Sequence, residues 1–239
     1  MAEKKSFQQK LEDYSDGVVK SLNYDRLRIW KEIFFHPTKT FAEQNPKAQL
    51  GRGAKDVFIS AIPGIVLGLL FILIYAAVLS LYGAIFVAAE PALAPLFSLG
   101  VGAMILLIIL YVISPVVWWI IASAVQYIVA KLLGGKANFR QHAYMTALAI
   151  ASATAFTVPF MILSLVPCIN YIAQPVIMLI GFYGIYLQFS GVRVVHKISD
   201  WKSAVVALIP MVLLILIIVG LYMALVAGMV AFVSAAKAA

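Results

Sequence analysis

Few side chains in this chain can bind a metal or transfer a proton, and its three histidines are the first candidates. They are His36, His142 and His196. Three imidazoles can hold a catalytic zinc, which keeps a fourth position open for water or substrate. No two of these histidines are three or four residues apart, however, and no acidic ligand accompanies all three. We therefore expect no metal and no cofactor, and we interpret the histidines as amphipathic side chains near a membrane surface.

Covalent and acid–base catalysis also lack a residue set. The single cysteine, Cys168, excludes an intrachain disulfide and a cysteine metal site. Glu90 and Asp200 are the only acidic residues after position 56, and they fall in different polar breaks. The pair Gly134-Gly135 lacks the remainder of a phosphate-binding loop, and its glycines instead predict a helix end with a positive φ. We therefore expect a protein without enzymatic activity.

The composition predicts a membrane protein. Hydrophobic residues make up 64% of the 239 residues and charged residues 12%, whereas soluble domains contain about 45–50% and about 25%. Residues 1–55 form a polar to amphipathic leader, and residues 56–239 are mostly apolar. No basic groove with interleaved aromatic residues is present, which argues against nucleic-acid binding. We predict two parts, a cytoplasmic leader and a membrane domain.

Five apolar segments are long enough to cross a bilayer, whose hydrocarbon core of about 30 Å requires about 20 helical residues. They cover about 57–82, 97–130, 143–165, 172–192 and 204–233. We therefore predict an all-α polytopic membrane protein with five transmembrane helices. Segment 97–130 is long, and Ser114-Pro115 at its middle predicts one kinked helix, because a turn there would leave unsatisfied backbone groups in lipid.

Basic residues are unevenly distributed along the chain. Residues 1–56 contain 11 of the 18 Lys and Arg residues and 8 of the 10 Asp and Glu residues. The polar breaks at 131–142 and 193–202 carry three basic residues each, whereas those at 83–95 and 166–175 carry none. The positive-inside rule then predicts a cytoplasmic N-terminus and an external C-terminus, in the plasma membrane if the source is prokaryotic. No signal-peptide core is found near the N-terminus.

Small residues spaced four apart predict close helix packing in lipid. The candidates are Gly64 and Gly68 in the first span, Ala147, Ala151 and Ala155 in the third, and Gly220, Ala224 and Gly228 in the last. The stripe in the third span begins at Ala143 and is the longest, so we expect this helix to be central. Gln126 and Gln188 lie inside spans, where they form interhelical hydrogen bonds or, as the alternative, line a solute pathway.

The leader contains an amphipathic helix just before the first span. Leu27, Trp30 and Phe34 follow the i, i+3, i+7 pattern, and Pro37 ends this helix and suits the start of a second one that carries Phe41. A basic amphipathic helix of this kind is typical of a membrane interface. The alternative is a helix that packs its apolar face on its own protein.

Three segments carry a resemblance to a known family. They are "FFHPTKTFAEQNP" before the first span, "LLGGKANFRQHAYMTAL" between the second and third, and "YGIYLQFSGVRVVHKISDWKSAVVALI" between the fourth and fifth. Their order and spacing, over about 36–230, resemble the Yip domain family of Ypt/Rab-interacting proteins. The last segment is similar to the family pattern that opens the fifth span, at His196, Ile198, Ser199, Lys202 and Ala204.

The resemblance implies a five-helix membrane protein that organises membranes or recruits a partner in trafficking, with a small GTPase as candidate partner by family analogy. The short leader is more similar to the minimal prokaryotic form. The alternative function is an oligomeric small-solute channel or permease, and a homo-oligomer is left open. The expected contacts with anionic lipid or a partner are Trp30, Phe34, Pro37, Phe41, Lys136, Phe139, Arg140, Arg193, His196, Ser199 and Lys202.

Overall fold

The computed structural model of the chain describes residues 25–89 and 94–238, and the regular structure within these residues is helical. The helix over residues 25–35, here called the leader helix, is followed by α2 (Pro37–Gln44) and a 3-10 turn (Asn45–Lys47). The long helices are α3 (Leu50–Ala89), α4 (Ala94–Leu132), α5 (Phe139–Leu163), α6 (Pro167–His196) and α7 (Asp200–Ala238). All five contain segments long and apolar enough to cross a membrane. The predicted fold is confirmed, and the protein is a multi-pass integral membrane protein.

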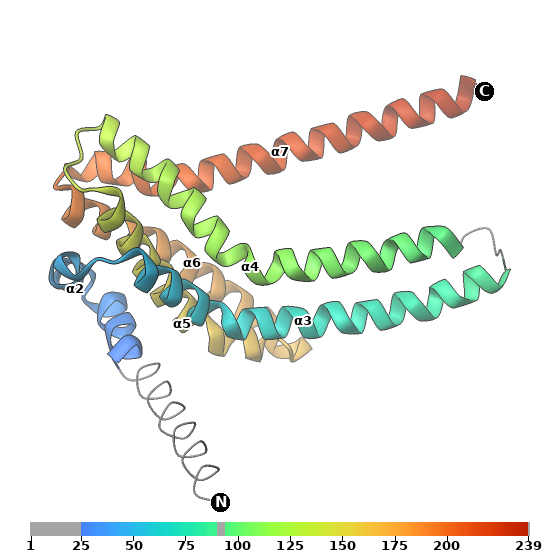
Figure 1. Cartoon of the computed structure of the whole chain (residues 1–239), viewed down its shortest axis with the longest axis horizontal. Helices are drawn as coiled ribbons and strands as arrows, with labels where there is room; N and C mark the ends of the chain where they lie inside the picture. Colours follow the sequence, from blue (N-terminus) through green and yellow to red (C-terminus); the bar gives the residue numbers. More distant parts are fainter. Residues whose placement is uncertain (1–24, 90–93, 239) are drawn as a thin grey trace, which may run out of the picture.

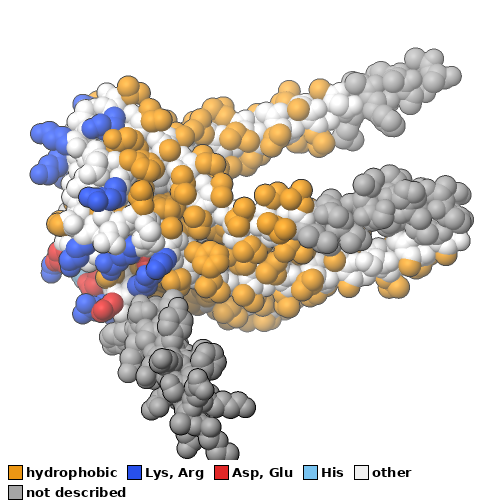
Figure 2. Space-filling model, in the orientation of Figure 1, with side chains coloured by type: hydrophobic (Ala, Val, Ile, Leu, Met, Phe, Trp, Pro, Cys, Tyr) orange, Lys and Arg blue, Asp and Glu red, His pale blue; other side chains and the backbone are white. Residues whose placement is uncertain are grey.

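Charge and hydrophobicity separate along the bundle. The helix α2, the loop over residues 133–138 and the turn over residues 197–199 lie at one end, on the left of Figure 1. Lys and Arg side chains gather at this end, here called the basic end, whereas hydrophobic side chains cover most of the remaining described face (Figure 2). An apolar surface with its charges at one margin is what a lipid bilayer requires of a membrane domain.

The helices extend beyond the predicted spans. α3 begins at Leu50 and α7 at Asp200, whereas the hydropathy of the sequence predicts 57 and 204. The hydropathy criterion selects apolar segments, so it leaves out the polar first turns of these helices. In α3 these turns carry Arg52 and Lys55. The first membrane helix therefore begins inside the segment that the sequence assigns to the leader.

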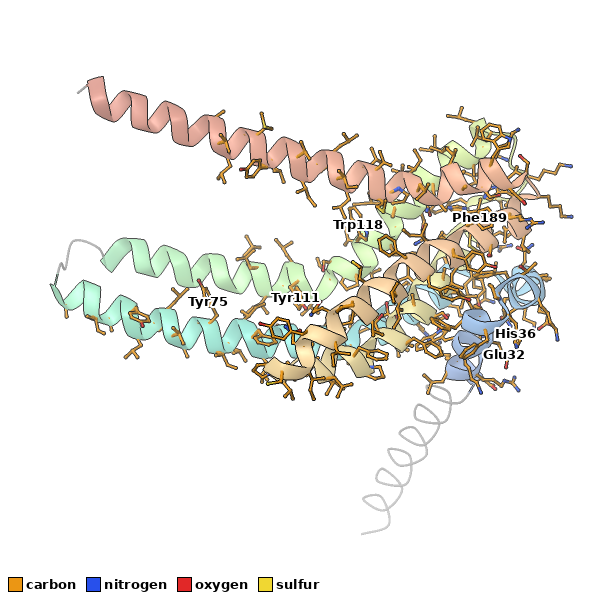
Figure 3. All side chains as sticks on the ribbon, turned by 180° about the vertical axis from the view of Figure 1, so that it is seen from behind. Glu32, His36, Tyr75, Tyr111, Trp118 and Phe189 are labelled. Atoms are coloured by element: carbon orange, nitrogen blue, oxygen red, sulfur yellow. The ribbon has the colours of Figure 1, made fainter. Side chains whose placement is uncertain are left out.

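α4 is one helix with a bend. It contains Pro115 in its interior, and Figure 3 shows the ribbon changing direction between the labelled side chains of Tyr111 and Trp118. Proline removes one backbone hydrogen bond and displaces the preceding turn, which bends a helix without ending it. The prediction of a single kinked helix is confirmed.

α5 lies at the centre of the bundle, packed against α3, α4 and α6. Its residues 142–149 are buried, together with Ala151 and Ser152. Asn138 caps the helix: its side chain accepts a hydrogen bond from the Gln141 backbone N–H at 2.9 Å, and the Gln141 side chain accepts one from the Asn138 N–H. Such a capping box satisfies two backbone donors at once. Small side chains along α5 let three neighbouring helices approach it closely.

The outer half of α7 has no neighbour within the described chain. Residues 211–228 are exposed, and no atom lies within 4 Å of a Cβ placed on Gly220 or Gly228. Figure 1 shows α7 diverging from α3 and α4 toward the C-terminus. The prediction that Gly220, Ala224 and Gly228 pack against another helix of this chain is therefore wrong, because a small-residue stripe permits close approach but does not supply a partner.

α3 and α4 approach each other through the two glycines of the first span. The Tyr111 hydroxyl of α4 donates a hydrogen bond to the Gly64 carbonyl at 3.0 Å. A Cβ on Gly68 would overlap the Tyr111 ring, and one on Gly64 would meet Met161 of α5 at 3.5 Å. The absence of a side chain at Gly68 therefore makes room for the aromatic ring between the two helices.

Replacing Gly68 with alanine should lower the melting temperature of the protein in nanodiscs. The methyl group displaces a rigid ring and strains its hydrogen bond, an overpacking cost of about 1–3 kcal/mol. Gly181→Ala is the matched control, because nothing lies within 4 Å of a Cβ at that helical position. Equal melting temperatures for the two variants would show that Tyr111 yields without cost.

Candidate functional site at the basic end

The exposed cations predicted for the inner loops lie together at the basic end (Figure 2). The exposed members of the predicted contact set are Lys136, Arg140, Arg193 and Ser199, and the half-buried members are Phe34, Phe139 and Lys202. The Arg193 side chain bonds Asp200 at 2.9 Å, and both groups remain mostly exposed. These side chains give the end of the bundle a surface with an excess of positive charge.

Four residues of the predicted contact set are buried instead. Trp30 is 3% exposed, Phe41 1% and His196 0%, and Pro37 is also buried. Trp30 and Phe34 of the apolar stripe contact Ser152 and Phe156 of α5, so this part of the stripe is covered by protein rather than by lipid. Leu27 and Phe35, at 52% and 56% exposure, are the large apolar side chains that the leader helix leaves open. The prediction that these four buried residues contact the membrane surface is therefore corrected.

The leader helix is fixed to the membrane helices by hydrogen bonds to its backbone. Ser152 of α5 donates to the Trp30 carbonyl at 2.6 Å, and Tyr183 of α6 donates to the Phe34 carbonyl at 2.6 Å. The Phe34 ring also stacks on Phe156, with ring centroids 3.9 Å apart. Carbonyls in the last turn of a helix lack intrahelical partners, and the Tyr183 hydroxyl satisfies one of them.

A buried ion pair joins the leader helix to the first turns of α3. The Arg26 guanidinium lies 3.0 Å from the Asp56 carboxylate, with side-chain exposures of 16% and 1%. Arg52, one turn earlier in α3, lies over the Tyr144 ring at 5.8 Å from its centroid. Neither Arg26 nor Asp56 is among the site residues predicted from the sequence. The available signal was an acidic residue placed directly before an apolar span, since such a group requires a partner when it is buried.

Two of the three histidines form a buried pair. His142 Nδ1 of α5 and His196 Nε2 of α6 are 2.9 Å apart, and both rings are 0% exposed. A Cβ on Gly135 would overlap the His196 ring, so the loop between α4 and α5 closes directly over the pair. The Lys136 N–H also donates to the His196 carbonyl at 3.2 Å. The pair therefore joins the start of α5, the end of α6 and this loop.

The geometry of the histidines does not match the three-ligand arrangement weighed from the sequence. His36 is exposed at the turn between the leader helix and α2 (Figure 3). Within residues 25–89 and 94–238, no three His, Cys, Asp or Glu side chains form a group that could hold a metal ion. Lys202 also connects two elements at the basic end, since its ammonium group donates to the carbonyl of Leu133, just after α4, at 2.9 Å.

A further group of polar contacts involves α4 residues that lie before its C-terminal end. The Trp119 indole N–H donates to the Ala143 carbonyl and to the Thr146 hydroxyl, which also bonds Ser123 at 2.6 Å. Gln126 donates to the Gln188 side-chain carbonyl at 2.7 Å, across α4 and α6. Interhelical hydrogen bonding therefore accounts for the position of both carboxamides, and their geometry does not favour the solute pathway.

Comparison with known proteins places the chain in a family. The model of the Yip1 domain matches residues 31–223, from the leader helix through most of α7. The match includes the ion-paired start of α3, the histidine pair and all five membrane helices. Searches of curated proteins and of solved structures gave no match. Since the matched region covers most of the chain, this protein belongs to the Yip1 domain family.

Proposed function

We propose that this protein is a non-enzymatic membrane scaffold whose basic end lies on the cytoplasmic face and contacts anionic lipid. The observation that carries the proposal is the gathering of exposed Lys and Arg at one end of an otherwise apolar bundle (Figure 2). Basic side chains near an anionic leaflet contribute about 1 kcal/mol each. In this orientation the N-terminus is cytoplasmic and the C-terminus external, as the positive-inside rule predicts.

A structural role agrees with how the polar side chains of this end are used. The two buried histidines bond each other, Asp56 bonds Arg26, and Lys202 caps α4. Each of these interactions connects two helices or a helix and a loop. The proposed activity is therefore the display of a fixed surface to lipid and to a protein partner. A small GTPase is the candidate partner from family membership, and self-association is compatible with the uncovered outer half of α7.

The orientation can be tested with single cysteines in sealed vesicles. Cys168, the natural cysteine, is exposed at the start of α6, opposite the basic end. We expect an impermeant maleimide to label it in right-side-out vesicles without permeabilisation. The double variant Cys168→Ser, Ser199→Cys should be labelled only after permeabilisation. The reverse labelling pattern would overturn the proposed orientation.

The lipid contact can be tested by counting the anionic lipids retained by purified protein in mixed phosphatidylglycerol and phosphatidylcholine nanodiscs. Arg140→Glu should reduce the enrichment of phosphatidylglycerol, because it reverses an exposed charge at the basic end. Lys237→Glu, the same charge change near the C-terminus, is the control and should leave the enrichment unchanged. Equal effects of the two variants would indicate that net charge alone sets the lipid preference.

A further inference from the structure

The buried histidine pair has a single internal hydrogen bond for its four ring nitrogens. His142 Nδ1 and His196 Nε2 are 2.9 Å apart and bond each other. His142 Nε2 and His196 Nδ1 are buried and have no hydrogen-bond partner among the residues that the structure describes. Buried polar atoms usually have a partner, so the pair depends on the bond between its two rings.

The number of protons on the pair determines whether this arrangement can persist. A neutral imidazole has one N–H donor and one bare nitrogen. In the neutral pair one ring donates to the other, and the two outer nitrogens then carry one N–H group between them. One further proton turns both outer nitrogens into donors without acceptors and leaves a positive charge on the pair. The neutral form is therefore the one that fits the buried site.

The loop over residues 133–138 covers the outer nitrogen of His196. A Cβ on Gly135 would overlap His196 Nδ1, and both rings of the pair are 0% exposed. The Gly135 N–H donates to the Ala130 carbonyl at 2.8 Å, and the Lys136 N–H donates to the His196 carbonyl at 3.2 Å. In this closed arrangement solvent does not reach the rings, so a charged imidazole could be solvated only after the loop has moved.

Cations surround the histidine pair. Lys131 of α4 is close enough for its charge to act on His196. Tyr127, on the preceding turn of α4, contributes an aromatic ring whose centroid lies 6.1 Å from that of His142 and 6.2 Å from that of His196. The other cations on the elements around the pair are Lys136, Arg140, Arg193, Lys197 and Lys202. A positive charge on either ring would therefore be repelled by its neighbours.

The acidic groups of the adjoining helices have other partners or face solvent. Asp200 at the start of α7 is paired with Arg193, and Asp56 of α3 is paired with Arg26. Glu43 of α2 is exposed. No salt bridge involving either buried histidine occurs in the part of the chain that the structure describes. A proton added to the pair thus destabilises the closed arrangement.

We propose that the histidine pair is a pH-sensitive switch, which holds the loop over residues 133–138 closed while both rings are neutral and opens it when they take up protons. The ordinary pKa of histidine is about 6.5, so rings that reach solvent in the open form bind protons below this pH. Proton binding to the open form alone shifts the equilibrium toward that form as the pH falls. Opening adds two positive charges to the basic end and frees Lys136 from the end of α6. The inference goes beyond the proposed function, since it makes the charge of the basic end depend on pH.

The test is amide hydrogen exchange of the full chain in nanodiscs between about pH 7.5 and 5.0, expressed as protection factors so that the intrinsic pH dependence of exchange is removed. Each histidine that binds a proton only in the open form raises the open population up to about tenfold per pH unit below about 6.5. We therefore expect the protection of the Gly135 and Lys136 amides to fall by at least about tenfold over this range. The Thr40 amide, which donates to the carbonyl of the exposed His36 at 3.1 Å, is the internal control and should keep its protection.

Two substitutions assign the pH dependence to the pair. His142→Gln keeps a carboxamide that can bond His196 but leaves one titratable ring, so the logarithm of protection should fall with pH about half as steeply. His36→Gln removes the exposed histidine at the turn before α2. It is the matched control and should leave the fall in protection unchanged.

Constant protection of the Gly135 and Lys136 amides in the natural sequence would overturn the switch, and this measurement requires no variant. An equal fall at Thr40 would indicate general unfolding, and an unchanged slope in His142→Gln would assign the response to a different group. Either of these results also overturns the proposal. The outcomes do not depend on which face of the membrane carries the basic end, so failure of the switch leaves the proposed orientation and lipid contact standing.

Discussion

Asp56→Ala should destabilise this protein by about 3 kcal/mol and release the leader helix, because removal of one partner leaves a largely buried charge without compensation. Asp56 is 1% exposed and its partner Arg26 16%. The value is at the lower end of the range for broken buried ion pairs, since Arg26 keeps some contact with solvent. The measurement is thermal unfolding in nanodiscs, combined with limited proteolysis of residues 25–49, which should be cleaved faster in the variant.

Asp200→Ala provides the matched control for this prediction. The Arg193–Asp200 ion pair has a similar distance, 2.9 Å, but its side chains are 53% and 65% exposed. An exposed pair of this kind contributes at most about 1 kcal/mol. Replacing both Arg26 and Asp56 with leucine should recover part of the lost stability, because no charge then remains buried. A small, equal loss for Asp56→Ala and Asp200→Ala would mean that the leader helix does not depend on this ion pair.

Gly135→Ala should cost about 2–4 kcal/mol, the sum of an overpacking cost and one strained buried hydrogen bond. A methyl group at this position overlaps the His196 ring and lies close to the Ala130 carbonyl, a backbone atom that cannot rotate away. The expected result is a lower melting temperature and loss of the contact between His142 and His196. The nitrogen chemical shifts of the two rings, measured in nanodiscs, report this contact directly.

Two comparisons separate the cause of this effect from a general intolerance of alanine. Gly51→Ala, at an exposed helical position with nothing within 4 Å, should be neutral. His196→Ala removes the ring that the new methyl group would meet, so the double variant Gly135→Ala, His196→Ala should lose less stability than the two single variants together. Additive losses would contradict the proposed steric contact between the loop and the histidine.

The corrected role of the leader shows what an amphipathic pattern leaves undecided. The spacing of Leu27, Trp30 and Phe34 predicts a helix with one apolar face, and residues 25–35 are helical. The pattern requires that this face leave water, but lipid and protein satisfy that requirement equally. In the structure Trp30 is covered and Leu27 is half exposed. The face therefore divides between the two environments according to the position of α5.

The small-residue stripes show the same limit at the level of helix packing. Ala147 and Ala151 of α5 are fully buried, whereas Gly220 and Gly228 of α7 have open space around them. Both stripes have the spacing that allows two backbones to approach closely. Whether another helix occupies that space depends on the direction in which each helix leaves the basic end, and the spacing contains no information about that direction.

The sequence by itself determined the all-α class, the five membrane helices, the single kinked helix over α4 and the family. These features depend on local composition and on residues close together along the chain, so that hydropathy and proline chemistry are sufficient to predict them. Only the tertiary structure decided which polar groups meet. Arg26 and Asp56, or His142 and His196, are separated by 30 and 54 residues. Their contact depends on how whole helices cross, which side-chain type and spacing do not specify.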